Sequence, residues 1–372
     1  MHISHLHLSH FRNYAELEIV PCSAINCFTG PNGSGKTNIL DALHYLAFTR
    51  GFRSTQDQQA VQEGASFFVT GATVEKKGQG IDIQCNFVKG KGKKILINRE
   101  PLAKMSDHIG SIPLVAVLPN DTDLIYGSSS DRRRFLDMLI AQYDHSFLNH
   151  LIQYEKILNQ RNALLKHFGE QGYFDREQLE LWNTQLVPHG IRIYEGRRQF
   201  LREFKPIFLE YFKKIVSREE TPALSYRSQI QENTIDGWLD LLAEYEQRDR
   251  VNQYSGAGVH RDDLVFHIDE QSVKNFGSQG QQKTFVIALR LAQYQLLERE
   301  TGTAPVLLLD DIFDKLDEHR LASIATLLDR EVAGQVFVTD TAHERLRQLL
   351  GKVRDREVAY FQVHNGQVSP ME

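Results

Sequence analysis

One eight-residue segment constrains the fold of this chain more than any other. Residues 30–37 read GPNGSGKT, and an apolar run at 25–29 precedes them. After them Ile39, Leu40 and Leu43 recur at helical spacing. A glycine-rich loop between a buried strand and a helix presents backbone N–H groups and the positive end of the helix dipole to phosphate oxygens. The segment predicts a nucleoside-triphosphate site, and a glycine-rich turn without a ligand is the alternative interpretation.

The residue types of the loop suit a bound triphosphate. Lys36 would neutralise phosphate charge, and the Thr37 hydroxyl would ligate Mg²⁺, which prefers oxygen ligands and keeps several waters. Arg12, after the opening strand, is a further candidate for the nucleotide, with a salt bridge inside the sheet as the equal alternative. The ATP contacts expected from the loop itself are Gly30, Pro31, Asn32, Gly33, Ser34, Gly35, Lys36, Thr37 and Asn38.

A second segment narrows the choice among kinases, GTPases, helicases, transporter motors and DNA-repair ATPases. Residues 306–311 read VLLLDD, an apolar run that ends in two carboxylates. A buried parallel strand delivers such acids to the carboxyl edge of its sheet. Asp310 then suits the Mg²⁺ shell, and Asp311 suits orientation of the attacking water. The alternative is a strand followed by a solvated acidic turn, Asp310 to Asp317.

A third segment, 276–283, reads FGSQGQQK and stands before a helical pattern at 285–296. Its serine and glycine would lie at a helix N-terminus, which is a second surface able to hold phosphate; an ordinary serine-capped helix is the alternative. The segment resembles the signature motif of ABC-type ATPases, which comes from the opposite subunit and closes over the γ-phosphate. The resemblance implies a head-to-head dimer with Ser278, Gly280 and Gln281 acting in trans.

These motifs, with five further strings in the same order, are similar to RecF, a family of bacterial recombinational-repair ATPases related to SMC proteins. The resemblance implies a slow, DNA-stimulated ATPase that uses ATP and Mg²⁺, with Lys36 and Asp311 catalytic. It further implies an ATP-dependent homodimer that binds duplex DNA at single-strand gaps and promotes recombinase loading in repair and replication restart, with RecR and RecO as partners. The five strings are LSHFRNY at 8–14, TNILDA at 37–42, DRRRFLD at 131–137, QRNALL at 160–165 and GVHRDDL at 258–264.

Three features depart from the general ABC pattern. Asp311 stands where transporters and SMC proteins usually carry the longer Glu, so turnover should be slow. After the apolar run at 336–339, the position that is often a switch histidine is Asp340, with His343 three residues later, and either could sense the γ-phosphate. The run at 115–118 leads into PND, where a glutamine loop is usual. A transporter-type motor should keep that loop, and a non-hydrolysing ATP-binding scaffold is the other alternative.

The periodicity predicts an α/β fold: an ABC-type P-loop ATPase head with a mixed sheet and helices, plus an inserted lobe of short helices. From about 128 the apolar period becomes helical. Pro188, Gly190, Gly196 and Pro206 punctuate this region, so we expect several short helices and no long coiled coil. Strand patterns occur at 3–8, 17–20, 25–29, 67–74, 81–88, 94–97 and 114–118. The expected division is 1–119 for the N-terminal part of the head, 120–249 for the lobe and 250–372 for the C-terminal part of the head.

Composition restricts where nucleic acid could bind. The 43 Lys and Arg residues against 48 Asp and Glu residues give a net charge of −5, so any DNA surface must be local. Candidates are Lys91, Lys93 and Lys94 at an expected hairpin tip and Arg132 on a helix, with a solvated loop and surface salt bridges as the alternatives. Three cysteines without metal spacing, and no long apolar run, favour a cytoplasmic protein without a membrane partner.

Overall fold

The computed structural model describes residues 1–371 except 54–55, 217–219, 314–317, 352 and 354–355, so most of the acidic turn after Asp311 lies outside the described residues. The chain packs into two compact units. The first comprises Met1–Asp121, Glu210–Glu219 and Lys283–Glu372, and the second comprises Thr122–Leu209 and Glu220–Gln282. Among the described helices, none combines the length and the apolar character needed to cross a bilayer.

An antiparallel sheet forms one layer of the first unit, in the order β2-β1-β4-β5-β6-β7. Residues of β1 that point inward, such as Leu6 and Leu8, are fully buried, whereas their neighbours are partly exposed. This alternation is typical of a sheet with one covered face. The strands are β1 (His2–Phe11), β2 (Tyr14–Ile19), β4 (Phe67–Lys76), β5 (Gln79–Val88), β6 (Gly92–Ile97) and β7 (Glu100–Pro101).

A second, largely parallel sheet of the first unit positions the site, in the order β15-β14-β3-β13-β12-β8. Its inner strands β3, β13 and β12 and its edge strand β8 are buried at every residue, as expected where both faces are covered. Because these strands are parallel, their carboxyl ends meet at one edge. The strands are β3 (Ile25–Thr29), β8 (Leu114–Val117), β12 (Val306–Asp310), β13 (Val336–Asp340), β14 (Val358–His364) and the antiparallel β15 (Gln367–Met371).

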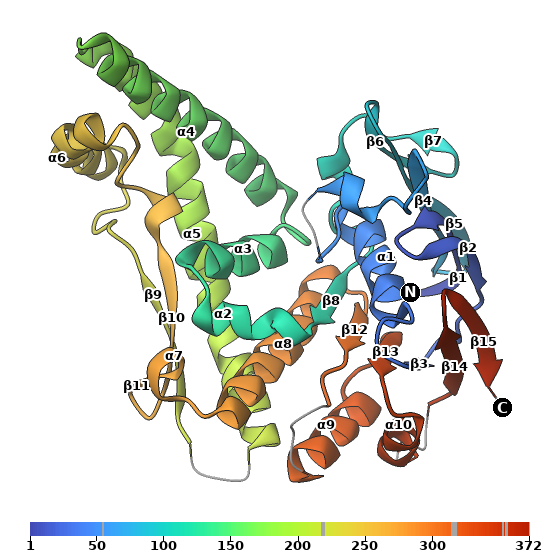
Figure 1. Cartoon of the computed structure of the whole chain (residues 1–372). Coiled ribbons are helices and arrows are strands. Elements are labelled where there is room, and N and C mark those ends of the chain that lie inside the picture. The colour runs from blue at the N-terminus through green and yellow to red at the C-terminus, as the bar shows by residue number, and fades with distance from the viewer. Residues whose placement is uncertain (54–55, 217–219, 314–317, 352, 354–355, 372) are drawn as a thin grey trace. The chain divides into compact units, whose positions relative to one another are not determined.

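Helix α1 (Lys36–Phe48) lies between the two sheets, since it contacts β4 and β5 of one and β8, β12 and β13 of the other (Figure 1). This position explains why Ile39, Leu40, Leu43 and Leu46 are all buried. The unit also holds α9 (Glu318–Arg330), α10 (His343–Leu350) and most of α8 (Gln279–Thr301). All seven strand segments that the sequence predicts are present, and the mixed α/β head is confirmed.

The second unit is mainly helical, with a small antiparallel sheet in the order β11-β10-β9. The expected boundary at 249 does not divide the compact units, because β10 pairs with β9 and so holds residues up to Gln282 in this unit. Its elements are α2 (Asp123–Tyr126), α3 (Ser129–Ile140), α4 (His145–Gln171), α5 (Arg176–Ile215, whose last turns belong to the first unit), β9 (Pro222–Arg227), α6 (Ile235–Asn252), β10 (Asp263–Ile268), β11 (Gln271–Ser272) and α7 (Val273–Phe276).

The expectation of several short helices is wrong. Helix α4 has 27 residues, and α5 has 40 and runs through Pro188 and Pro206. A proline inside a helix costs about 3 kcal/mol, but each large apolar side chain buried along one face returns about 1.5–3 kcal/mol. The buried face of α5 includes Leu186, Ile193, Phe200, Phe204, Phe208 and Phe212. Tertiary burial therefore outweighs the local helix-breaking signal.

The glycines of α5 serve close packing. A Cβ built on Gly190 would lie 2.4 Å from the ring of Trp238, and one on Gly196 would lie 2.6 Å from the ring of Phe147. Helices α4 and α5 run antiparallel as a hairpin, since Phe147 meets α5 near Gly196 whereas Arg161 bonds Asn183 much earlier in that helix (Figure 1). Small residues in this stretch mark helix contacts.

Candidate active site

The glycine-rich loop follows β3 and leads into α1, as predicted. A Cβ on Gly35, whose φ is +120°, would lie 2.6 Å from both Asn13 Nδ2 and the Tyr14 hydroxyl, and one on Gly30 would lie 2.1 Å from the Val363 carbonyl oxygen. On Gly33 it would meet no heavy atom within 4 Å. The loop is therefore tight against the protein at its ends and open at its middle, where Pro31, Asn32 and Gly33 are exposed.

Lys36 lies over this loop. Its ammonium donates to the carbonyl oxygens of Gly30 at 2.7 Å and Pro31 at 2.9 Å. Burial lowers the pKa of Lys36, while the charges of Asp311 and Asp310 oppose that shift. A cation whose bonds go to neutral carbonyls can still attract phosphate, because Coulomb attraction is strong where solvent is partly excluded.

The surroundings of the Ser34 hydroxyl indicate whether the loop fits a triphosphate. Ser34 is 3% exposed, and its Oγ has no hydrogen-bond partner among the described residues. Leaving such a group unsatisfied costs about 1–3 kcal/mol. A phosphate oxygen would accept its proton, so the residues present fit the predicted ligand.

Thr37 and Asp310, the two expected Mg²⁺ ligands, meet at the carboxyl edge of the parallel sheet. Thr37 Oγ1 donates to Asp310 Oδ1 at 2.9 Å, although 273 residues separate them in the chain. Thr339 Oγ1 donates to the same oxygen at 2.6 Å. Burial raises the pKa of Asp310, and these two hydroxyl bonds partly offset the rise. The pair forms an oxygen cluster suited to Mg²⁺.

Asp311 follows Asp310 in a left-handed conformation, with φ of 48°. Its N–H donates to Thr339 Oγ1 at 3.1 Å and to the Thr339 carbonyl oxygen at 3.3 Å. Thr339 thus positions both acids. Sequence reasoning missed this threonine, because nothing in an apolar strand pattern marks which residue will face the neighbouring strand's carboxylate.

The two candidates for the γ-phosphate sensor differ in environment. Asp340 is fully buried and accepts from Ala342 N at 2.7 Å and from the Arg345 guanidinium at 2.6 and 2.9 Å. The ring of His343 packs edge-on against Tyr360, and its Nδ1 is buried without a hydrogen-bond partner among the described residues. Asp340 already accepts hydrogen bonds from Ala342 and Arg345, whereas Nδ1 of His343 could bond a ligand.

Residues of the string at 8–14 hold the glycine-rich loop in place through hydrogen bonds and an ion pair. Asn13 donates to the Ser34 carbonyl oxygen at 3.1 Å and accepts from Asn38 at 2.7 Å. Arg12 forms an ion pair with Asp41 of α1, at 2.8 Å, so its partner lies on the helix and not within the sheet. Arg53, which no sequence pattern singled out, donates to Asn38 Oδ1 at 2.9 Å, and its charge opposes the rise in the pKa of Asp310 that burial causes.

The signature segment forms a helix start in the second unit, as predicted. Ser278 N donates to Gln281 Oε1 at 2.8 Å, and Gln281 N donates to Ser278 Oγ at 3.2 Å. These reciprocal bonds are a capping box at the beginning of α8, next to the half-exposed Gly280. Gln281 Nε2 also donates to Glu220 Oε1 at 3.2 Å. Gln281 therefore fixes the position of Ser278.

Comparison with known proteins decides the family. The model described as RecF/RecN/SMC N terminal domain matches residues 2–368. The "DNA replication and repair protein RecF" of Flavobacterium johnsoniae is 44% identical over 350 residues, covering 94% of this chain and 97% of that protein. The protein of the same name from Parabacteroides distasonis is 40% identical over 372 residues, all of both chains. This chain belongs to the RecF family. It is therefore a DNA replication and repair protein.

Solved structures agree with the RecF assignment. A structure titled "Structure of the recombination mediator protein RecF-ATP in RecFOR pathway" matches with a TM-score of 0.89 and 26% identity, covering all of this chain and 98% of that one. An Smc head domain from Pyrococcus furiosus matches with a TM-score of 0.58 at 16% identity, which shows the shared fold alone. The family is one of ABC-type ATPases, so the predicted family and fold are both confirmed.

The four DNA candidates of this RecF-family chain fall into two groups. Lys91 and Lys94 are exposed at or beside the turn between β5 and β6. Lys93 Nζ lies 2.9 Å from both carboxylate oxygens of Asp57. Arg132 donates to both carboxylate oxygens of Asp263, at 2.7 and 3.1 Å. The last two side chains support the fold through ion pairs.

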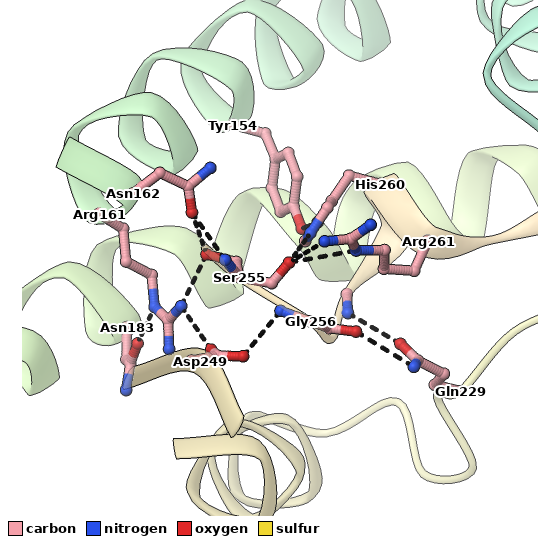
Figure 2. A network of polar contacts seen from close by, with 11 residues as sticks. Tyr154, Arg161, Asn162, Asn183, Gln229, Asp249, Ser255, Gly256, His260 and Arg261 are labelled. Atoms are coloured by element: carbon pink, nitrogen blue, oxygen red, sulfur yellow. Dashed lines mark hydrogen bonds and ion pairs between the residues drawn. The ribbon is translucent and has the colours of Figure 1, made fainter. Parts of the chain in front are cut away.

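Two RecF-like strings meet in a polar network inside the second unit (Figure 2). Arg161 and Asp249 form an ion pair at 2.7 Å, and both side chains are fully buried. Arg161 also donates to Ser255 Oγ at 2.6 Å, and the Ser255 carbonyl oxygen accepts from His260 at 3.0 Å and from Arg261 at 2.6 Å. The strings at 160–165 and 258–264 thus hold the segment around Ser255 and Gly256 in place.

Proposed function

We propose that this chain binds ATP with Mg²⁺ at the glycine-rich loop and hydrolyses it in a slow, DNA-stimulated reaction. The bond from Thr37 Oγ1 to Asp310 Oδ1 carries this proposal, because it joins the helix after the loop to the acid strand. The RecF structure whose title names bound ATP supports the same ligand.

Each residue of the site has a role in this proposal. Residues 30–38 surround the phosphates, with Lys36 neutralising their charge. Thr37 and Asp310 would hold Mg²⁺, which supplies further neutralisation when it is bound. Asp311 orients and deprotonates the attacking water, and Thr339 keeps its backbone in place. Arg12 is retained as a nucleotide contact at the rim, although it is paired with Asp41 before any nucleotide binds.

We further propose an ATP-dependent homodimer in which the signature residues act on the partner's nucleotide. The Ser278 hydroxyl accepts from Gln281 N, so its own proton can be donated to a phosphate oxygen. The Gly280 region adds the positive end of the α8 dipole. His343 is the proposed γ-phosphate sensor, because Asp340 is neutralised by Arg345.

The proposed nucleic-acid ligand is duplex DNA at single-strand gaps. Lys91 and Lys94 would contact phosphates without reading bases. Lys93 and Arg132 would contribute indirectly, by holding the elements around them. A RecFOR pathway is named for a similar RecF, which supports RecR and RecO as partners of this chain in recombinase loading, in the cytoplasm.

The ATP hydrolysis rate per subunit, measured across protein concentration with and without duplex DNA, tests the proposal. We expect a rate that rises with concentration and rises again with DNA, and that is lost in Asp311→Asn. A rate per subunit that is constant and indifferent to DNA would leave a self-contained nucleotidase. Binding of ATP without turnover would instead favour a scaffold.

A further inference from the structure

Two large aromatic side chains of the second unit are exposed beside the signature serine. Phe276 is 70% exposed and Tyr126 is 50% exposed. The short helices that carry them, α7 and α2, contact each other, so both exposed residues belong to one small region of the unit. We call Tyr126 and Phe276 the aromatic pair. Ser278 follows Phe276 by two residues and is itself exposed.

Hydrogen bonds fix Tyr126, and the backbone next to Phe276, relative to the signature helix. The Tyr126 hydroxyl donates to Gln282 Oε1 at 2.7 Å. Gln282 is buried in the first turn of α8, and its Nε2 donates to the carbonyl oxygens of Gly277 at 2.9 Å and Val273 at 3.3 Å. One glutamine therefore ties α2, α7 and α8 together, and Tyr126 is held through its hydroxyl while the residue stays 50% exposed.

Exposed aromatic side chains that lie close together are typical of the centre of a protein interface. Tyr is enriched among the residues that contribute most to binding, and rigid rings lose little entropy on contact. Two rings alone fall far short of the roughly 1,200 Å² that a stable interface buries in total. The pair can therefore strengthen an association that another contact begins, but it cannot hold two proteins together by itself.

We propose that the aromatic pair is a contact surface for a second copy of this chain, covered only when nucleotide joins the two copies. This inference rests on the proposed function, because Ser278 reaches a triphosphate only in the head-to-head dimer. Phe276 precedes Ser278 by two residues, and Tyr126 bonds Gln282 four residues after Ser278, so a partner that approaches Ser278 also approaches the aromatic pair. Their burial would exclude water beside the signature serine and strengthen the dimer that nucleotide begins.

Sedimentation velocity with Mg²⁺ and the non-hydrolysable analogue AMP-PNP tests the inference on the full chain. We expect the unchanged protein to dimerise with AMP-PNP, and Phe276→Ala to weaken that dimer by about tenfold or more, the effect typical of a central interface residue. Tyr126→Ala should weaken it as well. Tyr126→Phe keeps the ring and should retain most of the dimer. Leu181→Ala is the matched control, because Leu181 is 60% exposed in the same unit but lies far from the signature in sequence.

Binding of a fluorescent ATP analogue at dilute monomer separates a docking role from misfolding. Phe276→Ala should bind it as tightly as the unchanged protein. Equal dimerisation of Phe276→Ala and the unchanged protein would overturn the inference while leaving the composite site intact. Loss of DNA retention without loss of the dimer would place nucleic acid on the pair and also overturn it. If the unchanged protein forms no dimer with AMP-PNP, the proposed dimer and this inference fail together.

Discussion

The nucleotide site of the first unit and the polar network of the second use buried polar groups in opposite ways. In the loop, the Ser34 hydroxyl is buried without a partner among the described residues, and Lys36 bonds only carbonyl oxygens of its own loop. In the network, Arg161 donates to Asn183, Asp249 and Ser255, although its Nη2 is also buried without a partner among the described residues. The candidate ligand site leaves a whole buried hydroxyl unused, whereas the structural network uses most of its polar capacity internally. Both regions carry RecF-like strings, so family resemblance alone does not separate catalysis from architecture.

The largest effect should come from the network. Arg161→Ala would leave the fully buried Asp249 without its ion-pair partner, which costs about 3–5 kcal/mol of unfolding free energy. Denaturant unfolding measures this loss. The control is Lys166→Ala, because Lys166 has an exposed partner in Glu170 at 3.8 Å, and we expect a loss under about 0.5 kcal/mol. Equal stability of the two variants would mean that the network does not support the unit.

Lys36→Ala should have the opposite effect: a large loss of activity and a small change in stability. We expect kcat/KM for ATP hydrolysis to fall by about 100-fold or more, because the variant lacks the cation that neutralises the phosphates. Unfolding free energy should change little, since among the described residues the ammonium bonds two carbonyls of its own loop. Lys91→Ala, assayed without DNA, is the control. If Lys36→Ala is much less stable but its folded fraction hydrolyses ATP at the normal rate, the role of Lys36 is structural.

Thr339→Val tests the positioning of the acids. Valine keeps the shape but removes the hydroxyl that bonds Asp310 Oδ1 and the Asp311 N–H. We expect kcat to fall by about tenfold, equivalent to about 1.4 kcal/mol, with ATP affinity within a few-fold of the unchanged protein. Single-turnover hydrolysis and equilibrium nucleotide binding separate the two quantities. An unchanged kcat would show that Asp311 needs no support from this strand.

His260 should make the stability of the network depend on pH. Burial and, to a smaller extent, nearby arginines lower the pKa of His260 to about 4, against 6.5 for the unperturbed group. The folded protein therefore holds His260 neutral while the unfolded chain protonates it, so stability is lost as pH falls from about 6.5 towards 4. At pH 5.5 the expected loss is about 1 kcal/mol.

His260→Gln should remove this part of the pH dependence. Glutamine can still donate to the Ser255 carbonyl oxygen and accept from the Tyr154 hydroxyl, which bonds His260 at 2.9 Å. Thermal unfolding at pH 7.5 and 5.5 gives the slope for each protein. Equal slopes would show that His260 titrates alike in the folded and unfolded chain.

The smallest effect should come from the hairpin tip. Lys91→Ala with Lys94→Ala should weaken duplex binding several-fold and reduce the slope of log affinity against log salt by about 2, since each phosphate contact contributes about 0.9. Lys93→Ala is the contrast, because Lys93 is paired with Asp57 and should mainly affect stability. Identical salt slopes for the double variant and the unchanged protein would remove the tip from the DNA surface.

The sequence by itself determined the features that are encoded locally. The phosphate loop, the strand alternation and the helix start after Ser278 each depend on residues a few positions apart, so their patterns are readable without a structure. The three motifs of the site and the α/β head followed from these patterns. The order of the RecF-like strings then indicated the family.

Only the tertiary structure decided which distant groups meet. The bond between Thr37 and Asp310 depends on parallel strands placed at one sheet edge by register. The uninterrupted course of α5 through Pro188 depends on an apolar face buried by tertiary packing. The ion pairs of Lys93 and Arg132 depend on acids 36 and 131 positions away. Local propensity is a small energy, and long-range burial and pairing exceed it wherever the fold brings partners together.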